Sequence, residues 1–209
     1  RVLRSAGVNV PESIDILSRS DVSKMDLVSM VKPLGYPVMV KPSKQGSTIG
    51  MSKVETEGNL QRAVEEAFKY DNQVLIESFV RGTEITVGLL GNTDPQVLPI
   101  VEIVPAKGFY DYEAKYTPGA TEEIVPARIS ENAAAEARRL ALVSHKALGC
   151  RGMSRVDMIV QPDDSVVVLE VNTIPGMTPT SLLPTATKAA GIEFPELLDR
   201  LIQLALEEE

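Results

Sequence analysis

Two runs of residues near the C-terminal end, separated by a turn-like stretch, predict a β-hairpin with one polar face. In residues 154–160, the apolar Val156, Met158 and Val160 alternate with other residues, so the intervening Arg155 and Asp157 fall on one face of a strand. In residues 166–172, Glu170 and Asn172 share a face by the same alternation. Such a hairpin fixes which polar side chains can meet, and so constrains both fold and chemistry.

The pairing of this hairpin brings acidic side chains together. If the chain folds back midway between residues 163 and 164, Asp157 faces Glu170 and Arg155 faces Asn172. Directly opposed β-carbons lie roughly 5 Å apart, where two carboxylates repel unless a cation separates them. Carboxylate and amide oxygens suit Mg²⁺ bound together with substrate phosphates. The alternative is an ordinary antiparallel hairpin whose polar face is solvated.

The stretch that follows, residues 173–184, contains three prolines, one glycine and four hydroxyl residues. Proline stiffens such a loop, while backbone amides and hydroxyl groups can bind an anion. We expect a receptor for a substrate carboxylate here. A rigid surface connection is the alternative.

A lysine and a glycine-rich stretch lie upstream. Residues 38–42 read as a short strand that includes Lys41, and residues 43–50 are rich in glycine and hydroxyl groups before a second strand begins. The lysine precedes the glycines, so this is not a Walker A loop. The pattern instead favours a β-hairpin that folds over nucleotide phosphates, with an ordinary turn as the alternative.

A third segment could bind the rest of a nucleotide. Residues 73–80 read as a buried strand, whose backbone beside apolar side chains can pair with the edge of an adenine. After a turn, Glu84 could accept hydrogen bonds from ribose hydroxyls. A glutamate after a glycine-containing turn is also common on protein surfaces.

The segments that carry these features occur in one order along nearly the whole chain. They are residues 41–42, 46–50, 82–87, 109–112, 114–116, 155–157, 170–173 and 175–178. In this order they closely resemble the D-alanine:D-alanine ligases of the ATP-grasp superfamily. The resemblance implies an α+β fold, with two α+β subdomains of mainly antiparallel sheets that enclose a nucleotide between them.

The resemblance assigns nucleotide roles to five positions. Lys41 and Lys115 would hold the phosphates of ATP. The backbone near Glu77 and Val80 would meet the adenine, and Glu84 would bind the ribose.

It also assigns the chemistry of the hairpin. Asp157, Glu170 and Asn172 would bind two Mg²⁺ ions, which Mn²⁺ could replace, with Glu170 bridging them. Arg155 and the backbone amide of Gly176 would stabilise the tetrahedral intermediate.

Four further positions would handle the substrates. Ser47 would belong to the lid and contact the substrate region, while Ser181 and the amide of Leu182 would receive the carboxylate of the second D-alanine. Tyr116, in an aromatic loop expected to close over the site, stands where some D-lactate-using relatives have histidine, and so favours D-alanine.

The implied reaction joins two D-alanine molecules through an acylphosphate, for peptidoglycan precursor synthesis. Another ATP-grasp carboxylate–amine ligase, a D-alanine:D-lactate ligase, and a nucleotide-binding fragment without turnover remain alternatives. The intact enzyme is expected to be a cytoplasmic homodimer. A net charge of −8 argues against a nucleic-acid partner, no apolar run reaches the roughly 20 residues of a membrane span, and the lone Cys150 fits a reducing compartment.

The resemblance divides the chain at residue 84. Residues 1–84 are expected to form the central ATP-grasp subdomain with its lid, and residues 85–209 the C-terminal subdomain with the metal and carboxylate site. The family's N-terminal domain, which supplies the first D-alanine site, has no counterpart in the sequence, so the chain alone is expected to bind nucleotide with little turnover. Helical spacing is present at residues 22–32, 59–70, 131–148 and 194–206.

Overall fold

The computed structural model describes residues 1–16, 18–22, 24–46, 48–106, 119–179 and 181–207. They form two compact units, each with an antiparallel sheet and a core of its own. The first unit contains residues 1–10, 81–106 and 121–207, and the second contains residues 11–80 with 119–120. The expected boundary between residues 84 and 85 therefore falls inside a strand, β5 (Thr83–Leu90).

The first ten residues belong to the first unit rather than to the part of the chain that follows them. Helix α1 (Val2–Ser5) contacts α6 (Glu131–Ala147), and Val8 is buried in the core of this unit. The carbonyl of Asn9 accepts a hydrogen bond from the N–H of Val168. The sequence division missed this because a contact over more than 150 residues leaves no local signal.

The second unit is a four-stranded sheet with helices packed on it, in the strand order β1-β4-β2-β3. Helix α4 packs on β2 and β3 and buries Leu60, Val64 and Ala67 against Val38 and Ile76. The expected helix over residues 22–32 is instead two short helices. The strands are β1 (Ser13–Ile16), β2 (Val38–Pro42), β3 (Ser52–Val54) and β4 (Val74–Ser78), and the helices are α2 (Arg19–Val22), α3 (Leu27–Val31), α4 (Leu60–Ala67), and the 3₁₀ turns η1 (Lys32–Leu34) and η2 (Glu57–Asn59).

The break in the expected helix has a local cause. The side chain of Asp26 caps α3 by accepting a hydrogen bond from the backbone N–H of Ser29 at 3.2 Å. An N-cap residue has non-helical backbone angles, so the helix has to restart there.

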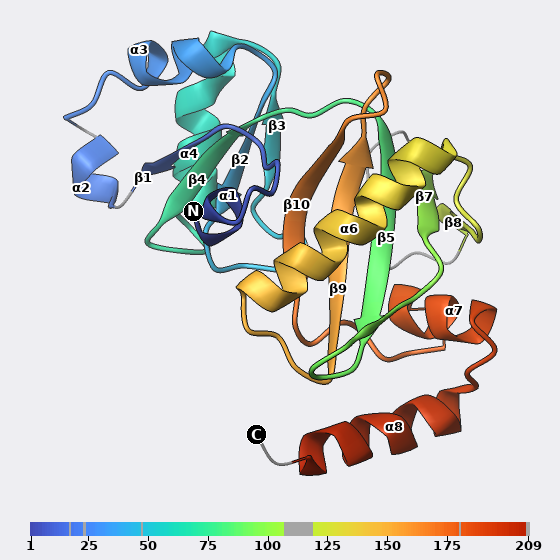
Figure 1. Cartoon of the computed structure of the whole chain (residues 1–209). Coiled ribbons are helices and arrows are strands. Elements are labelled where there is room, and N and C mark those ends of the chain that lie inside the picture. The colour runs from blue at the N-terminus through green and yellow to red at the C-terminus, as the bar shows by residue number, and fades with distance from the viewer. Residues whose placement is uncertain (17, 23, 47, 107–118, 180, 208–209) are drawn as a thin grey trace. The chain divides into compact units, whose positions relative to one another are not determined.

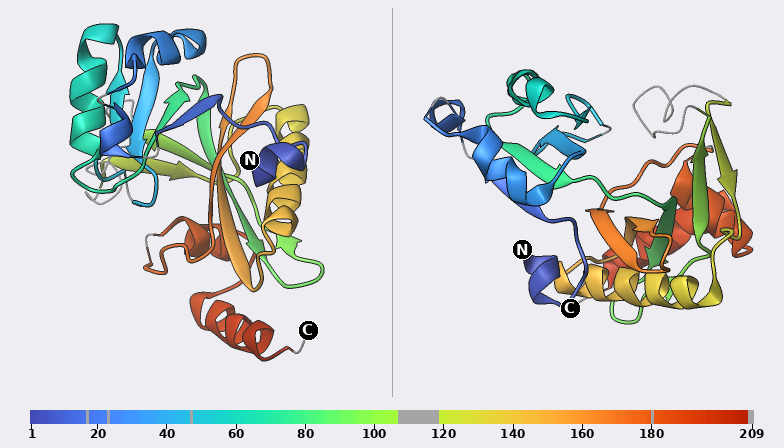
Figure 2. Two further views of the ribbon diagram at one scale, coloured as in Figure 1. Left: turned by 90° about the vertical axis from the view of Figure 1, so that its left-hand side faces the viewer. Right: turned by 90° about the horizontal axis from the view of Figure 1, so that it is seen from above.

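The first unit is built on a six-stranded sheet, in the order β10-β9-β5-β7-β8 with β6 beside β5. Figure 1 shows α6 crossing β5, β9 and β10, and in Figure 2 this helix runs along one side of the sheet. Helix α7 packs on β5 and β7. The remaining elements are β6 (Gln96–Val97), β7 (Val101–Pro105), β8 (Thr121–Ile124), β9 (Met153–Val160), β10 (Val166–Asn172), α7 (Leu182–Ala189) and α8 (Phe194–Leu206).

The alternation along β5 and β9 separates the two faces of this sheet. Ile85, Val87, Val156 and Met158 are buried in the same core as the inner side of α6. The residues between them therefore point to the opposite face. On that face, a β-carbon at Gly88 would lie 2.7 Å from Cδ1 of Leu183 of α7, so the leucine packs directly on the sheet where the glycine lacks a side chain.

The β9–β10 hairpin contains an irregularity that the sequence did not predict. Near the turn Val166 pairs with Val160 and Val168 with Met158, whereas beyond it Glu170 pairs with Asp157 and Asn172 with Arg155. The register shifts at Leu169, so one extra residue is accommodated there as a β-bulge. The predicted turn centre is thus wrong by half a residue, while the predicted pairing of the polar residues is confirmed.

Three expected helices lie where their spacing placed them, whereas α1 and α7 were not predicted. Ser130 caps α6 by accepting from the N–H of Ala133, and α4 and α8 agree with the apolar spacing. The stretch expected to remain a loop through Pro184 ends earlier, because α7 begins at Leu182. Proline is tolerated in the first turn of a helix, where its missing N–H would have no partner in any case. Among the described residues, no helix is long and apolar enough to cross a membrane.

Candidate active site

Four polar residues named from the sequence meet on the face of the first unit's sheet that carries α7. Asp157 lies between Glu170 of β10 and Thr86 of β5, and Arg155 lies between Asn172 and Gly88. Asp157 is only 7% exposed. The alternative of an ordinary solvated face therefore does not describe this part of the sheet, because a carboxylate is rarely buried without partners.

Each oxygen of the Asp157 carboxylate accepts two hydrogen bonds. Oδ1 accepts from Thr86 Oγ1 at 2.6 Å and from Arg155 Nε at 2.9 Å. Oδ2 accepts from Arg155 Nη2 at 2.7 Å and from Asn172 Nδ2 at 3.1 Å. These contacts make a bidentate arginine–carboxylate pair, which fixes both the position and the plane of the carboxylate.

The side-chain amide of Asn172 links the two acids of the hairpin. Its Nδ2 donates to Asp157 Oδ2 and also lies 3.3 Å from Glu170 Oε1. A partial positive charge thus lies between two carboxylates, where electrostatics favours a cation. Glu170 itself is exposed, so its second oxygen can take an external partner.

The donor set fits a hard cation that shares its coordination shell with a ligand. No group of three or more His, Cys, Asp or Glu side chains in the described part of the chain is arranged to hold a metal ion. Two carboxylates and one amide oxygen are too few for an ion held by protein alone. They suit Mg²⁺, which keeps waters and binds through one or two carboxylates plus substrate phosphates.

The loop after β10 brings the expected carboxylate-binding residues together. Ser181 Oγ accepts from the backbone N–H of Thr178 at 3.1 Å and lies 2.8 Å from Thr178 Oγ1. A β-carbon at Gly176 would be 2.9 Å from Ser181 Oγ, so the backbone at Gly176 can approach this hydroxyl only because it lacks a side chain. Ser181 is also the residue before α7, and Leu182 is the first residue of that helix. The amides of a first turn have no partner within the helix and can bind an anion.

Three of the expected nucleotide-binding residues lie in or next to β2 and β4 of the second unit. Lys41 of β2 forms an ion pair with Glu77 of β4, and the two side chains are 25% and 13% exposed. Val80, just beyond the end of β4, is half-buried. The preceding Phe79 donates its backbone N–H to the carbonyl of Pro37. Lys53 Nζ lies 4.4 Å from the centre of the Phe79 ring, which places a second lysine beside this strand. The sequence did not single out Lys53.

Glu84 lies in β5 of the first unit, on the same face as Thr86 and Asp157. The structure thus brings Glu84 onto the polar face that carries the acids of the hairpin. Ser47, Lys115 and Tyr116 lie outside the described residues, as does nearly all of the aromatic loop expected to close over the site.

Thr86 was not predicted, although it is the buried hydroxyl closest to the acids. Its period-2 spacing from Glu84 was visible in the sequence. Its partner was not, because the pairing of β5 with β9 joins strands about 70 residues apart.

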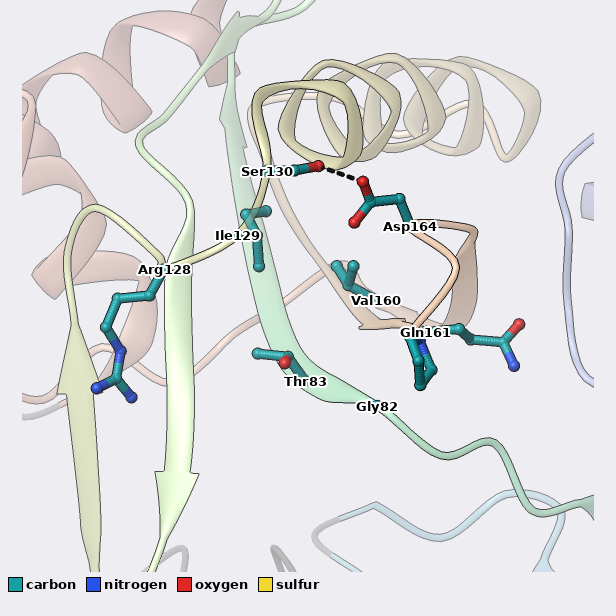
Figure 3. A pocket seen from close by; sticks show the side chains of 9 residues that line it. Gly82, Thr83, Arg128, Ile129, Ser130, Val160, Gln161 and Asp164 are labelled. Atoms are coloured by element: carbon teal, nitrogen blue, oxygen red, sulfur yellow. Dashed lines mark hydrogen bonds between the residues drawn. The ribbon is translucent and has the colours of Figure 1, made fainter.

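A pocket of about 280 Å³ lies on the other face of the same sheet (Figure 3). Its charged side chains already have partners, since Arg128 pairs with Glu102 and Asp164 accepts from Ser130 at 2.8 Å. Hydrogen bonds from Arg128 lower the pKa of Glu102. None of the predicted site residues lines this pocket. Its lining consists of Gly82, Thr83, Arg128, Ile129, Ser130, Val160, Gln161, Pro162 and Asp164.

Comparison with known proteins identifies the arrangement. The family model described as the D-ala D-ala ligase C-terminus matches residues 2–203. The chain belongs to the D-alanine–D-alanine ligase family. The D-alanine–D-alanine ligase of Desulforamulus reducens is 43% identical over the whole chain, which covers 67% of that protein. The ligase of Pelotomaculum thermopropionicum is 52% identical over 84% of the chain and 55% of its own length.

Solved structures of ligases of this kind share the fold. A D-Ala:D-Ser ligase from Enterococcus faecalis has a TM-score of 0.84 at 36% identity, over 97% of this chain and 59% of its own. A D-alanine–D-alanine ligase from Bacillus anthracis, complexed with ATP, has a TM-score of 0.81 at 33% identity, over 98% of this chain and 63% of its own. The ATP-grasp class expected from the sequence is therefore confirmed. The chain spans between about half and two thirds of the length of these relatives.

Proposed function

We propose that the chain carries the nucleotide, metal and second-substrate sites of an ATP-dependent ligase that joins two D-alanine molecules. The observation that carries the proposal is the buried Arg155–Asp157 pair beside Glu170 and Asn172 on one sheet face. Membership of the D-alanine–D-alanine ligase family and a structural relative complexed with ATP support it.

The reaction follows from activating a carboxylate with ATP. An oxygen of the first D-alanine carboxylate attacks the γ-phosphorus, and the bond from that phosphorus to ADP breaks. The amine of the second D-alanine then attacks the carbonyl carbon of the acylphosphate, loses a proton and releases phosphate. The protein needs no covalent intermediate, so its contribution is positioning and charge neutralisation.

Different residues of the chain would bind the nucleotide, the oxyanion and the metal ion. Lys41 and Lys115 would neutralise nucleotide phosphates, and Glu84 would hold the ribose. Arg155 and the Gly176 amide would face the oxyanion that forms when the amine attacks. Asp157, Glu170 and Asn172 would hold Mg²⁺ or Mn²⁺, which when bound screens the charge of the phosphate oxygens.

The second substrate would bind at the start of α7. Its carboxylate would accept hydrogen bonds from the Ser181 hydroxyl and from the Leu182 amide. Ser181 Oγ accepts from the Thr178 backbone and lies 2.8 Å from Thr178 Oγ1, so its proton is available to the substrate when the threonine hydroxyl is the donor of that contact. We propose D-alanine for this position, which Tyr116 favours by resemblance, and D-serine is the second candidate because of the D-Ala:D-Ser ligase among the structural relatives.

Several wider proposals rest on the family. A ligase that consumes ATP for peptidoglycan precursors would work in the cytoplasm, where ATP is made. That the intact enzyme is a homodimer rests on the resemblance alone.

The test is binding followed by turnover. Calorimetry with a non-hydrolysable ATP analogue and Mg²⁺ should show binding that Glu170→Gln weakens. Phosphate release and mass spectrometry of the products should then be compared for D-alanine, D-serine, D-lactate and L-alanine. Binding of nucleotide with no dipeptide would favour a nucleotide-binding fragment, and no nucleotide binding would refute the proposal.

A further inference from the structure

Thr86 contacts the candidate metal site but has no role in the proposed function. The residue is 1% exposed on β5, directly opposite Asp157 on β9. Its hydroxyl has one proton and two oxygens within reach, Asp157 Oδ1 at 2.6 Å and the carbonyl of Val156 at 3.3 Å. The shorter contact is to an ionised acceptor and has the length of a charge-assisted hydrogen bond, so the proton lies towards Asp157.

The two oxygens of Asp157 have different surroundings. Oδ1 is held by Thr86 and by Nε of Arg155, and both contacts are short. Oδ2 is held by Nη2 of Arg155 and by the amide of Asn172, which is the longest of the four contacts at 3.1 Å. The same amide nitrogen reaches Glu170, so Oδ2 is the oxygen on the side of the second acid.

Asn172 can exchange its donor for an acceptor at this place. A half-turn of its side-chain amide would replace Nδ2 with the amide oxygen, which could then share a cation with Asp157 Oδ2 and Glu170. At Oδ1 of Asp157 a donor cannot be replaced by an acceptor in this way, because its partners are a hydroxyl group and a guanidinium group that both donate to it.

We propose that Thr86 is a positioning residue for the metal site: its hydroxyl holds Oδ1 of Asp157 so that Oδ2 faces the cation. The inference rests on the proposed function, in which Asp157 is a metal ligand. Arg155 alone cannot secure this orientation throughout the reaction, because the same guanidinium is assigned to the oxyanion. When its nitrogens turn to the substrate, the Thr86 hydroxyl still fixes the plane of the carboxylate.

Two substitutions isolate the hydroxyl. Thr86→Val keeps the branched shape in the sheet and removes the donor, while Thr86→Ser keeps the donor and removes the methyl group. Thr187→Val is a matched control, because Thr187 is equally buried and its hydroxyl donates to the Pro184 carbonyl within α7, away from the acids of the hairpin. If Thr86→Val does not fold, Thr86→Ala replaces it in the comparison with Thr86→Ser.

The measurement is the dissociation constant of Mn²⁺ in the presence of a non-hydrolysable ATP analogue, from the electron paramagnetic resonance signal of free Mn²⁺. Loss of a group that orients a metal ligand typically weakens binding 10- to 100-fold, so Thr86→Val should weaken Mn²⁺ at least about tenfold. Thr86→Ser and Thr187→Val should stay close to the wild type, and the metal-free melting temperature reports folding separately.

The possible results test the positioning role of Thr86 and the proposed function separately. Wild-type affinity for Mn²⁺ in Thr86→Val would overturn the positioning role while leaving the proposed function intact. Equal weakening in Thr86→Val and Thr86→Ser would also overturn it, since the hydroxyl would then not be the active group. A wild-type protein that binds no Mn²⁺ with the nucleotide analogue would overturn the proposed function itself.

Discussion

The two acids of the hairpin should differ sharply in what they contribute to the stability of the metal-free protein. In Asp157→Asn, an amide faces three donor groups and the Arg155 guanidinium loses the charge of the Asp157 carboxylate. The side chains of Arg155 and Asp157 are 14% and 10% exposed, so water cannot fully replace the lost contacts. Breaking a buried ion pair costs about 3–5 kcal/mol, and the remaining exposure places this case near about 3 kcal/mol.

In Glu170→Gln, by contrast, the side chain is exposed and accepts a 3.3 Å hydrogen bond from Asn172, which the glutamine oxygen can also accept. We expect a change within about 0.5 kcal/mol, as for most surface substitutions. Both variants should nevertheless weaken Mg²⁺-dependent nucleotide binding.

Thermal and urea unfolding without metal would measure the difference. For a chain of 209 residues, about 3 kcal/mol corresponds to a lowering of the melting temperature by roughly 6–12 °C, against about 2 °C or less for Glu170→Gln. Equal melting temperatures for the two variants would show that Asp157 is not held as the distances indicate, and the description of the site would be wrong.

Three further results are expected. Mg²⁺ with an ATP analogue at 100 times its dissociation constant should stabilise the folded protein by about 2.7 kcal/mol, and Lys41→Met should remove most of the resulting rise in melting temperature; an unchanged rise would exclude Lys41 from the nucleotide site. Burial lowers the pKa of His145 below its ordinary value of 6.5, so the unfolded chain takes up this proton at a higher pH than the folded protein does, and the free energy of unfolding should decrease as the pH falls below about 6.5. Urea titrations at pH 5, 6 and 7 should show that the free energy of unfolding decreases less in His145→Gln than in the wild type. The same dependence on pH in both proteins would show that His145 does not cause the decrease. In this chain supplied with an N-terminal domain of the family, Ser181→Ala should raise the KM for the second amino acid by roughly 10- to 100-fold, the equivalent of one hydrogen bond to a charged group, and phosphate release at varied D-alanine would show an unchanged KM if Ser181 does not bind it.

The hairpin of β9 and β10 could be predicted from the sequence because its polar residues are brought together by strands that are close in sequence. Alternation placed Arg155 and Asp157 on one face, and folding across five residues paired them with Asn172 and Glu170. The β-bulge at Leu169 could not be read, since one extra residue in an apolar run changes no residue type. The helix of residues 131–147 was readable because its Ser130 cap and apolar spacing are local as well.

Features that depend on distant pairing were out of reach. Thr86 is an ordinary strand residue until β5 lies beside β9, and residues 1–10 carry no signal that they pack with α6. The start of α7 at Leu182 was hidden by Pro184, whose usual effect is to end a helix. These errors have one cause, namely that tertiary packing decides between local options that the sequence leaves open.

The central claim is that ATP activates the carboxylate of D-alanine, and an isotope experiment tests it directly. When this chain is supplied with an N-terminal domain of the family, D-alanine labelled with ¹⁸O in its carboxylate should transfer one labelled oxygen to the phosphate released in each turnover, because the oxygen that attacks the γ-phosphorus leaves with it when the amine attacks. Mass spectrometry of the phosphate would follow the label, with D-alanyl-D-alanine measured in the same sample. Labelled phosphate in equal amount to the dipeptide is the predicted result, and dipeptide formed alongside unlabelled phosphate would contradict the acylphosphate mechanism.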